Sequence, residues 1–290
     1  MFTGAIVALI TPFQNGQIDF KTLDDLIDFQ LENSIDAISP VGTTGESPTL
    51  DHEEHKKVIE RVVKTTAGEA PVIAGTGSNS TAEAIELTAF AKKIGADASL
   101  QVTPYYNKPT QEGFYQHFKA IAQEVDLPMV LYNIPGRCGA GMTPETIARL
   151  AEIENIVAIK EASGSLDQAS EIASRCDLTI LSGDDSLTLP IASVGGKGVI
   201  SVVANIVPAD VKAMTDLILE GDLVSARQWH NKLFALSKNL LGLATNPIPI
   251  KAAMAILNLA PEEMRLPMVP MEESKKIILR QTLKDYGLLK

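Results

Sequence analysis

A repeating unit of strand, loop and helix constrains the fold of this chain more than any other feature. Each unit begins with a short apolar run rich in β-branched residues, continues through a polar or glycine-rich loop, and ends in an amphipathic helical segment. The runs are GAIVALI (4–10), AISPVG (37–42), PVIAG (71–75), ASLQVT (98–103), PMVLY (128–132), IVAIK (156–160), TILSG (179–183) and GVISVV (198–203). Continuous apolar runs of this length are typical of parallel strands that are covered on both faces.

The helical segments between these runs carry their own start and stop signals. Asp51 and Glu54 have the spacing of a capping box at the start of one helix. Thr143 followed by Pro144 predicts an N-cap and a first helical residue, where the missing N–H of proline does no harm. Gly95 lies where the preceding helix is expected to stop. These signals support an α/β fold in which strands and helices alternate.

The number of units favours a TIM (β/α)8 barrel over an open doubly wound sheet. Dinucleotide-binding open sheets carry a GxGxxG motif after their first strand. Here TPFQNGQID (11–19) follows the first run, and we expect it to form a polar turn. After the last run the strand signals cease, while helical stretches continue at 209–220, 222–241, 247–258 and 271–286. We therefore expect a catalytic barrel over 1–224 and a C-terminal helical domain over 225–290.

Composition excludes several classes of function. A formal net charge of -11 argues against nucleic-acid binding, which needs a concentrated basic face. No apolar run approaches the ~18–20 residues that span a membrane, and the N-terminal segment lacks the positive region and cleavage site of a signal peptide. The two cysteines, Cys138 and Cys176, have no CxxC or zinc spacing. We expect a soluble cytoplasmic enzyme that binds neither nucleic acid nor membranes.

Catalytic groups of such barrels lie at the carboxyl ends of the strands and in the loops that follow them. In this sequence the rule selects GTTGES (42–47), TPYYN (103–107), YNIPGR (132–137) and Lys160-Glu161.

Lys160 ends a buried run, so partial desolvation would favour the neutral amine that attacks a carbonyl. The alternative is a lysine that extends to solvent or pairs with Glu161, since most lysines are exposed. Tyr132 ends the neighbouring strand, and its phenol can carry protons. Thr43 and Thr44 can continue this hydroxyl chain or bind a carboxylate. A core tyrosine and an ordinary glycine–threonine turn are the alternatives for these residues.

Arg137 is the single arginine in these loops, and its planar guanidinium suits a carboxylate; a solvated arginine is the alternative. The glycine-rich loops lack the Gly-Lys-Ser/Thr ending of a nucleotide-binding loop. Asp184 and Asp185 have no third ligand nearby in the sequence, so helix capping is favoured over Mg²⁺. His52 and His55 are three residues apart rather than four, unlike the zinc ligands of a zincin. We expect no metal.

Several motifs together resemble one known family. They are VGTTGES, PVIAGTGSNSTAEAI, VTPYYNKPTQEGFYQHF, YNIPGR, IKEASG, LSGDD, GVISVVAN and NPIPIK, and the similarity extends from FTGAIVALITPF to the C-terminus. The chain resembles the pyruvate-dependent class I aldolase family that contains N-acetylneuraminate lyase and dihydrodipicolinate synthase, and it is most similar to the synthase branch. The resemblance implies condensation of pyruvate with L-aspartate 4-semialdehyde to 4-hydroxy-tetrahydrodipicolinate, in lysine and diaminopimelate biosynthesis.

The resemblance also implies roles for individual residues and an assembly. Lys160 would form a Schiff base with pyruvate, without any other cofactor. A proton relay would consist of Thr43, Tyr132 and Tyr106, with Tyr106 supplied by a neighbouring subunit. The pyruvate carboxylate and the semialdehyde carboxylate would be bound by Thr44 and Arg137 respectively, beside Gly183 and the backbone of Ile200. A homotetramer, built as a dimer of dimers, is the implied assembly.

A second implied site binds L-lysine, a feedback inhibitor, in a crevice between two subunits. Its residues would be Ser47, His52, His55, Asn79, Glu83 and Tyr105, and the Glu83 carboxylate would pair with the cationic amine. A polar cluster that only caps helix ends is the alternative. Pro48 departs from the usual small residue of this site.

Two other functions remain open at this point. One is an aldolase of the same family for 2-keto-3-deoxy sugar acids, which would use the same Lys160. Cys138 and Met142 also depart from the commonest synthase loop, which leaves the fine specificity open. The other is a barrel that binds a keto acid without catalysis. The fold alone does not distinguish them, since TIM barrels carry many functions.

Overall fold

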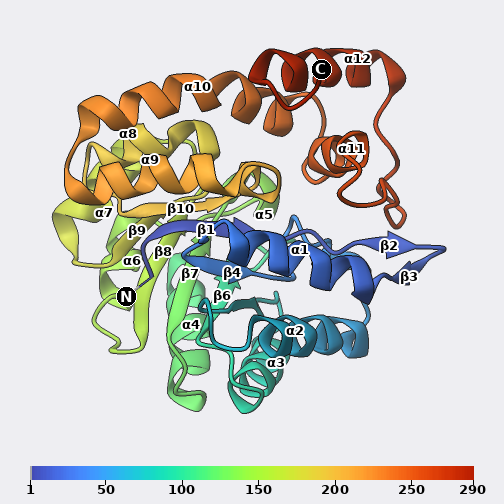
Figure 1. Cartoon of the computed structure of the whole chain (residues 1–290). Helices are drawn as coiled ribbons and strands as arrows, with labels where there is room; N and C mark the ends of the chain where they lie inside the picture. The colour runs from blue at the N-terminus through green and yellow to red at the C-terminus, as the bar shows by residue number, and fades with distance from the viewer. Residues whose placement is uncertain (1) are drawn as a thin grey trace.

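All eight predicted strands are present in one parallel sheet of the computed structural model, which describes residues 2–290 (Figure 1). They are β1 (Gly4–Ala8), β4 (Ala37–Ser39), β5 (Ile73–Gly75), β6 (Ala98–Val102), β7 (Met129–Asn133), β8 (Ile156–Glu161), β9 (Thr179–Ser182) and β10 (Gly198–Ser201). Their order in the sheet is β4-β1-β10-β9-β8-β7-β6-β5. A parallel bridge between Ile38 and Val72 joins the two ends. The predicted (β/α)8 barrel is therefore confirmed as a nearly closed one.

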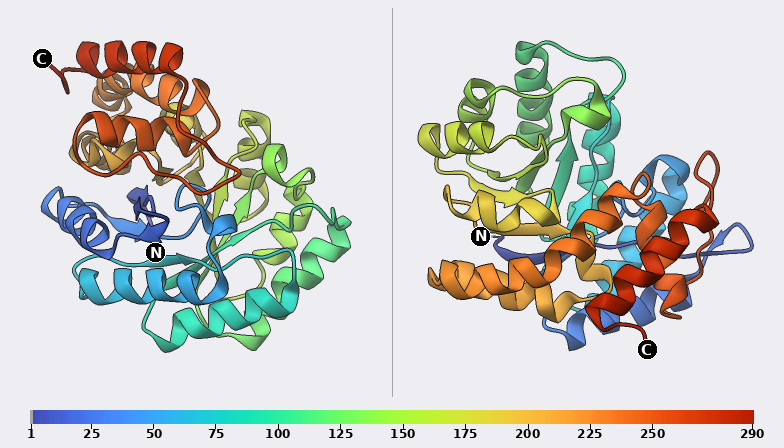
Figure 2. Two further views of the ribbon diagram at one scale, coloured as in Figure 1. Left: turned by 90° about the vertical axis from the view of Figure 1, so that its right-hand side faces the viewer. Right: turned by 90° about the horizontal axis from the view of Figure 1, so that it is seen from above.

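Helices follow the strands and surround the barrel (Figure 2). They are α1 (Phe20–Glu32), α2 (His52–Thr66), α3 (Thr81–Lys93), α4 (Gln111–Glu124), α5 (Pro135–Cys138), α6 (Pro144–Leu150), α7 (Leu166–Arg175), α8 (Thr188–Ala192) and α9 (Pro208–Glu220). The short turns η1 (Ser47–Thr49), η2 (Asp185–Leu187) and η3 (Val203–Asn205) precede α2, α8 and α9.

The predicted helix boundaries follow from local side-chain chemistry. Both hydrogen bonds of the Asp51–Glu54 capping box are present at the start of α2. The Thr143 side chain accepts a bond from a backbone N–H of the first turn of α6. Helix α3 ends at Lys93, and Gly95 follows with a φ of 91°, which glycine adopts without steric cost. These three predictions are confirmed.

The segment after the first strand differs from the expected polar turn. It forms a small antiparallel hairpin of β2 (Phe13–Gln14) and β3 (Gln17–Ile18). Asn15 and Gly16 connect the two strands, with φ of 53° and 76°. An Asn-Gly pair is the preferred connection for a two-residue hairpin because both residues tolerate positive φ. The sequence contained this signal, and the prediction of a plain turn missed it.

The C-terminal helices α10 (Leu223–Gly242), α11 (Ile248–Ile256) and α12 (Glu273–Tyr286) cover one side of the barrel (Figure 1). One apolar cluster extends from the barrel, for example from Val7, into these helices through Leu236 and Leu279. The predicted boundary at residue 224 falls at the second residue of α10. The division into two domains stays a prediction. None of the helices formed by residues 2–290 is both long and apolar enough to span a membrane.

Alternate strand residues fill the inside of the barrel, as expected for a closed sheet. The interior apolar cluster includes Leu100, Tyr132, Ala158 and Ile200. Because strand side chains alternate between the two faces, Lys160, two residues after Ala158, shares this inner face. Strand β8 thereby directs the Lys160 amine to the inside of the barrel at its carboxyl end.

Candidate active site

Lys160 and Tyr132 are partners in the ladder between β8 and β7. Their side chains lie on the same face, and the Lys160 Nζ is 4.2 Å from the centroid of the Tyr132 ring. Only 6% of Lys160 and 5% of Tyr132 is exposed. The alternative of a lysine that extends to solvent is therefore wrong. An amine held against an aromatic ring at a barrel mouth is sheltered from water and fixed in position.

Glu161 does not serve as the partner of Lys160, because it belongs to the opposite face of β8. Its carboxylate accepts hydrogen bonds from Asn133 Nδ2 at 3.0 Å and from the Ser163 N–H at 2.7 Å. Burial raises the pKa of Glu161, and these hydrogen bonds oppose the shift. Asn133 also accepts a bond from the Met142 N–H. This buried network holds the ends of β7 and β8 together directly behind the lysine.

Asp184 and Asp185 follow β9 and have different roles. Burial raises the pKa of Asp184, while the nearby Lys160 ammonium acts in the opposite direction. The Asp185 carboxylate accepts hydrogen bonds from the Ser201 hydroxyl and the Val202 N–H. The predicted capping of the following helix by an aspartate is wrong, since η2 has no side-chain cap; Asp185 instead binds backbone N–H groups of Val202 and Val203, after β10. Within residues 2–290, no group of three or more metal-ligating side chains is found.

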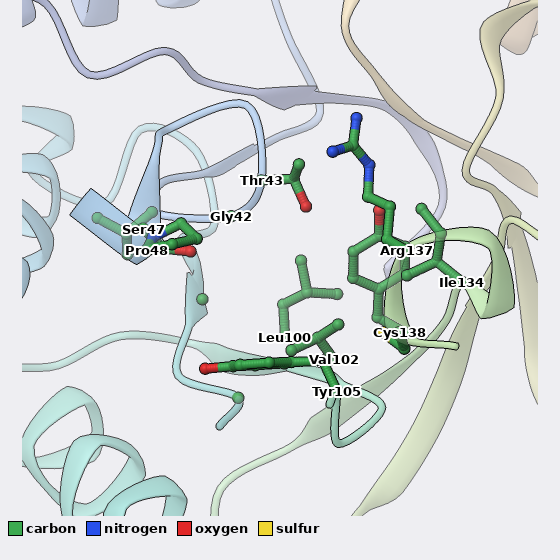
Figure 3. A pocket seen from close by; sticks show the side chains of 14 residues that line it. Gly42, Thr43, Ser47, Pro48, Leu100, Val102, Tyr105, Ile134, Arg137 and Cys138 are labelled. Carbon is green, nitrogen blue, oxygen red and sulfur yellow. The ribbon is translucent and has the colours of Figure 1, made fainter. Parts of the chain in front are cut away.

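A cavity of about 290 Å³ opens beside the Tyr132 ring (Figure 3). Thr43 and Arg137 lie on one side of it, and Tyr105 lies on the other. The Arg137 Nη2 donates to the backbone carbonyl of Asn246 at 3.1 Å. The remaining lining residues are mostly small or apolar: Val41, Gly42, Ser47, Pro48, Gly75, Gly77, Leu100, Val102, Ile134 and Cys138. A largely apolar cavity with a few convergent polar groups is typical of a small-molecule site.

Lys160 and the other predicted site residues are not among the residues that line this cavity: Thr44, Tyr106, Gly183 and Ile200. Thr44 is buried, and its hydroxyl accepts a hydrogen bond from Asn246 Nδ2 at 3.0 Å. Ile200 is fully buried inside the barrel. Gly183 follows β9, and a Cβ at that position would approach the Ala162 Cβ to 2.5 Å, so only glycine fits. Tyr106 is 90% exposed, has a φ of 71° and does not line the cavity of its own chain.

The six residues of the second predicted site come together at the start of α2 and α3. His52 Nε2 lies 2.5 Å from the Glu83 carboxylate, and the Asn79 side chain donates to the Tyr105 carbonyl. His55 Nε2 lies 2.7 Å from the Gly75 carbonyl, and burial lowers the pKa of this imidazole. Ser47 and Tyr105 line the cavity beside the candidate active site. The polar cluster is therefore continuous with that cavity rather than remote from it.

Sequence reasoning missed the residues that fasten the 42–47 loop to the C-terminal helices. Lys251 and Glu46 form an ion pair in which both side chains are almost completely buried. Burial lowers the pKa of the Lys251 ammonium, against the effect of Glu46. Arg265 forms two hydrogen bonds with Glu54 of α2. The motifs VGTTGES and NPIPIK contain Glu46 and Lys251, but nothing in either motif indicates that the two segments meet.

Fold and site together define an aldolase-type lyase: a (β/α)8 barrel with a buried amine, a tyrosine and an arginine at its mouth. The model of the dihydrodipicolinate synthetase family matches residues 1–286, and the chain belongs to this family. The 4-hydroxy-tetrahydrodipicolinate synthase of Geotalea uraniireducens is 55% identical over 291 residues, and 100% of each chain is covered.

Two solved structures are also similar. The dihydrodipicolinate synthase of Acinetobacter baumannii, solved in complex with pyruvate, has a TM-score of 0.97 at 43% identity, with 100% of both chains covered. The enzyme of Cyanidioschyzon merolae, solved with lysine bound, has a TM-score of 0.95 at 44% identity, with 99% of both chains covered.

Proposed function

We propose that this enzyme condenses pyruvate with L-aspartate 4-semialdehyde to give 4-hydroxy-tetrahydrodipicolinate, and that the reaction proceeds through a Schiff base on Lys160. The observation that carries the residue assignment is the Lys160 amine, buried at the barrel mouth and 4.2 Å from the Tyr132 ring centroid. Synthases related over their whole length favour this function over a sugar-acid aldolase and over a non-catalytic barrel.

The chemistry follows from the addition of the Lys160 amine to a ketone. The Lys160 amine adds to the pyruvate carbonyl and water leaves, giving an imine whose protonated form withdraws electrons from the methyl carbon. A methyl proton then leaves through the Tyr132 hydroxyl, and Thr43 continues the relay. The resulting enamine carbon attacks the aldehyde carbon. Finally the amine of the second substrate displaces Lys160 and closes the six-membered ring. None of these steps uses a metal or an organic cofactor.

Reductive trapping tests this proposal directly. Borohydride added with pyruvate should fix the imine as a stable secondary amine, and peptide mass mapping should place the adduct on Lys160. A parallel sample with borohydride alone should show no modification. An adduct on any other lysine, or none at all, would contradict the assignment.

The proposed relay is completed by Tyr106 from a neighbouring subunit. An aromatic side chain that is 90% exposed and does not line the cavity of its own chain is available to enter the site of another chain. This supports a tight dimer that exchanges Tyr106, and the homotetramer built as a dimer of dimers stays a prediction of the resemblance. The cytoplasmic location stays a prediction of the sequence.

Arg137 should determine the affinity for the second substrate. We expect Arg137→Lys to raise the KM for L-aspartate 4-semialdehyde by about tenfold or more, because an ammonium group does not reproduce a bidentate contact with a carboxylate. The KM for pyruvate should change little. The exposed Arg149, which pairs with Glu112, provides the control Arg149→Lys. Equal changes in both KM values would argue against a specific role in aldehyde recognition.

We further propose that L-lysine inhibits the enzyme at the cluster of Ser47, His52, His55, Asn79, Glu83 and Tyr105. The support is their convergence in the structure and the lysine-bound enzyme of Cyanidioschyzon merolae. The Glu83 carboxylate, 2.5 Å from His52, supplies the negative charge that an amine requires.

Glu83→Gln should raise the lysine concentration for half-inhibition by about tenfold or more, since a hydrogen bond between charged groups becomes one with a neutral amide. The measurement is turnover against lysine concentration, normalised to each variant without lysine. Glu86→Gln is the matched control, because Glu86 lies one turn further along α3 and pairs with Lys56. Undiminished turnover of the unmodified enzyme at millimolar lysine would refute the inhibition itself.

A further inference from the structure

Asn246 connects the two groups that the proposed function assigns to the two substrate carboxylates. Its side-chain Nδ2 donates to the Thr44 hydroxyl oxygen at 3.0 Å, and its backbone carbonyl accepts from the Arg137 guanidinium at 3.1 Å. The residue is 8% exposed and lies just before α11. One residue of the C-terminal segment thus contacts both the GTTGES loop and α5, the short helix after β7.

The direction of the bond to Thr44 has a chemical consequence. A hydroxyl group has one hydrogen to donate and lone pairs that accept. Because the Asn246 amide donates to the Thr44 oxygen, the Thr44 hydrogen stays available for another acceptor. Among residues 2–290, Asn246 is the one side chain that forms a hydrogen bond with the Thr44 hydroxyl. A carboxylate, which only accepts, is the natural complement to that remaining hydrogen.

The position of Asn246 is fixed by a second contact between the same two segments. Lys251, on α11, forms its buried ion pair with Glu46, two residues after Thr44. The Lys251 Nζ also donates to the Glu263 carbonyl and lies 4.3 Å from the centroid of the Phe13 ring. A buried pair with these additional contacts holds its geometry, since separating it would leave an uncompensated charge. The buried Lys251–Glu46 pair therefore keeps Asn246 in a fixed position relative to Thr44.

We propose that Asn246 is a positioning residue for the 2-keto acid substrate, acting by fixing the Thr44 hydroxyl as a donor to the keto acid's carboxylate. This inference rests on the proposed function, because that function assigns Thr44 to pyruvate and Arg137 to the aldehyde. Arg137 is held by the backbone carbonyl of Asn246, which every substitution retains. A side-chain change at Asn246 should therefore act on pyruvate and leave aldehyde recognition in place.

The test compares Asn246→Ala, the isosteric Asn246→Asp, Thr44→Val and the double variant Thr44→Val/Asn246→Ala in the full-length enzyme. Asn246→Ala should raise the KM for pyruvate by about tenfold, the effect of losing one well-formed hydrogen bond. The KM for L-aspartate 4-semialdehyde should stay within about twofold of the value for the unmodified enzyme, because the substituted side chain does not contact the group that binds this substrate. Asn246→Asp should be the more harmful variant, because its carboxylate takes the Thr44 hydrogen and repels the carboxylate of pyruvate.

The double variant should be no worse than Thr44→Val alone, because residues that act through one contact are not additive. The matched controls are Asn239→Ala and Asn239→Asp, since Asn239 Nδ2 donates to the Thr282 hydroxyl at 2.7 Å between α10 and α12. These controls should leave both KM values unchanged. If Asn246→Ala does not fold, the isosteric Asn246→Asp decides the test.

An unchanged pyruvate KM, an equal rise in both KM values, or multiplicative effects in the double variant would each overturn the inference. Failure of the proposed function has a different signature. In that case the unmodified enzyme itself would form no borohydride-reducible adduct with pyruvate, and the inference would fall with it. A normal adduct in the unmodified enzyme, combined with an unaffected Asn246→Ala variant, would overturn the inference alone.

Discussion

Replacing Lys160 by alanine is expected to lower kcat by at least about 10⁴-fold, the scale seen when a covalent nucleophile is removed. The amine is buried and lies 4.2 Å from the Tyr132 ring centroid, so no solvent-exposed lysine can take its place. Without an imine, the methyl carbon of pyruvate keeps its protons and does not attack the aldehyde. The measurement is the rate of condensation together with mass mapping after borohydride reduction, which should give no adduct.

Lys197→Ala is the matched control for this experiment. Lys197 is exposed and immediately precedes β10, so it lies at the opposite end of the barrel from the proposed site. This variant should retain the activity and the adduct of the unmodified enzyme. Carbon–carbon bond formation at an undiminished rate in Lys160→Ala would rule out the Schiff-base mechanism.

The second large effect is expected for Tyr132→Phe, which should lower kcat by about 10²- to 10³-fold, within the range for loss of a general acid–base group. The substitution keeps the ring that packs against Lys160 and removes only the hydroxyl. The imine should therefore still form with pyruvate, while proton transfer from the methyl carbon becomes slow. Rapid-quench borohydride trapping and exchange of the pyruvate methyl protons in D₂O separate these two steps.

Tyr115→Phe is the matched control, because Tyr115 belongs to α4 and its ring lies under the Arg149 guanidinium on the outside of the barrel. It should retain activity. If Tyr132→Phe exchanged the pyruvate methyl protons as fast as the unmodified enzyme, Tyr132 would be a packing residue and the relay would need another member.

Much of the fold could be predicted because its signals are local. Capping at Asp51 and at Thr143 depends on a side chain and a backbone N–H only a few residues away. The apolar runs become strands because each is buried on both faces. The hairpin at Asn15 and Gly16 was missed although its signal is equally local, so that error came from the interpretation rather than from the sequence.

The placement of Lys160 at the mouth could be predicted from its position at the end of a strand, since that rule holds for barrels in general. The pairing of Lys160 with Tyr132 follows from the register between β8 and β7. The residue pattern of one strand does not define its register with a neighbouring strand. The same register and alternation assign Glu161 to the other face, where it contacts Asn133. Adjacent residues in the sequence thus acquired unrelated roles.

The sequence by itself determined which strands and helices form, and therefore which side chains reach the carboxyl end of the barrel. Only the tertiary structure decided how these side chains are supported. Asn246 meets Thr44 across 202 residues of chain, and Lys251 meets Glu46 in a fully buried pair. Periodicity and capping act over a few residues, whereas such contacts exist only after the closed barrel and the C-terminal helices have packed together and excluded water between them.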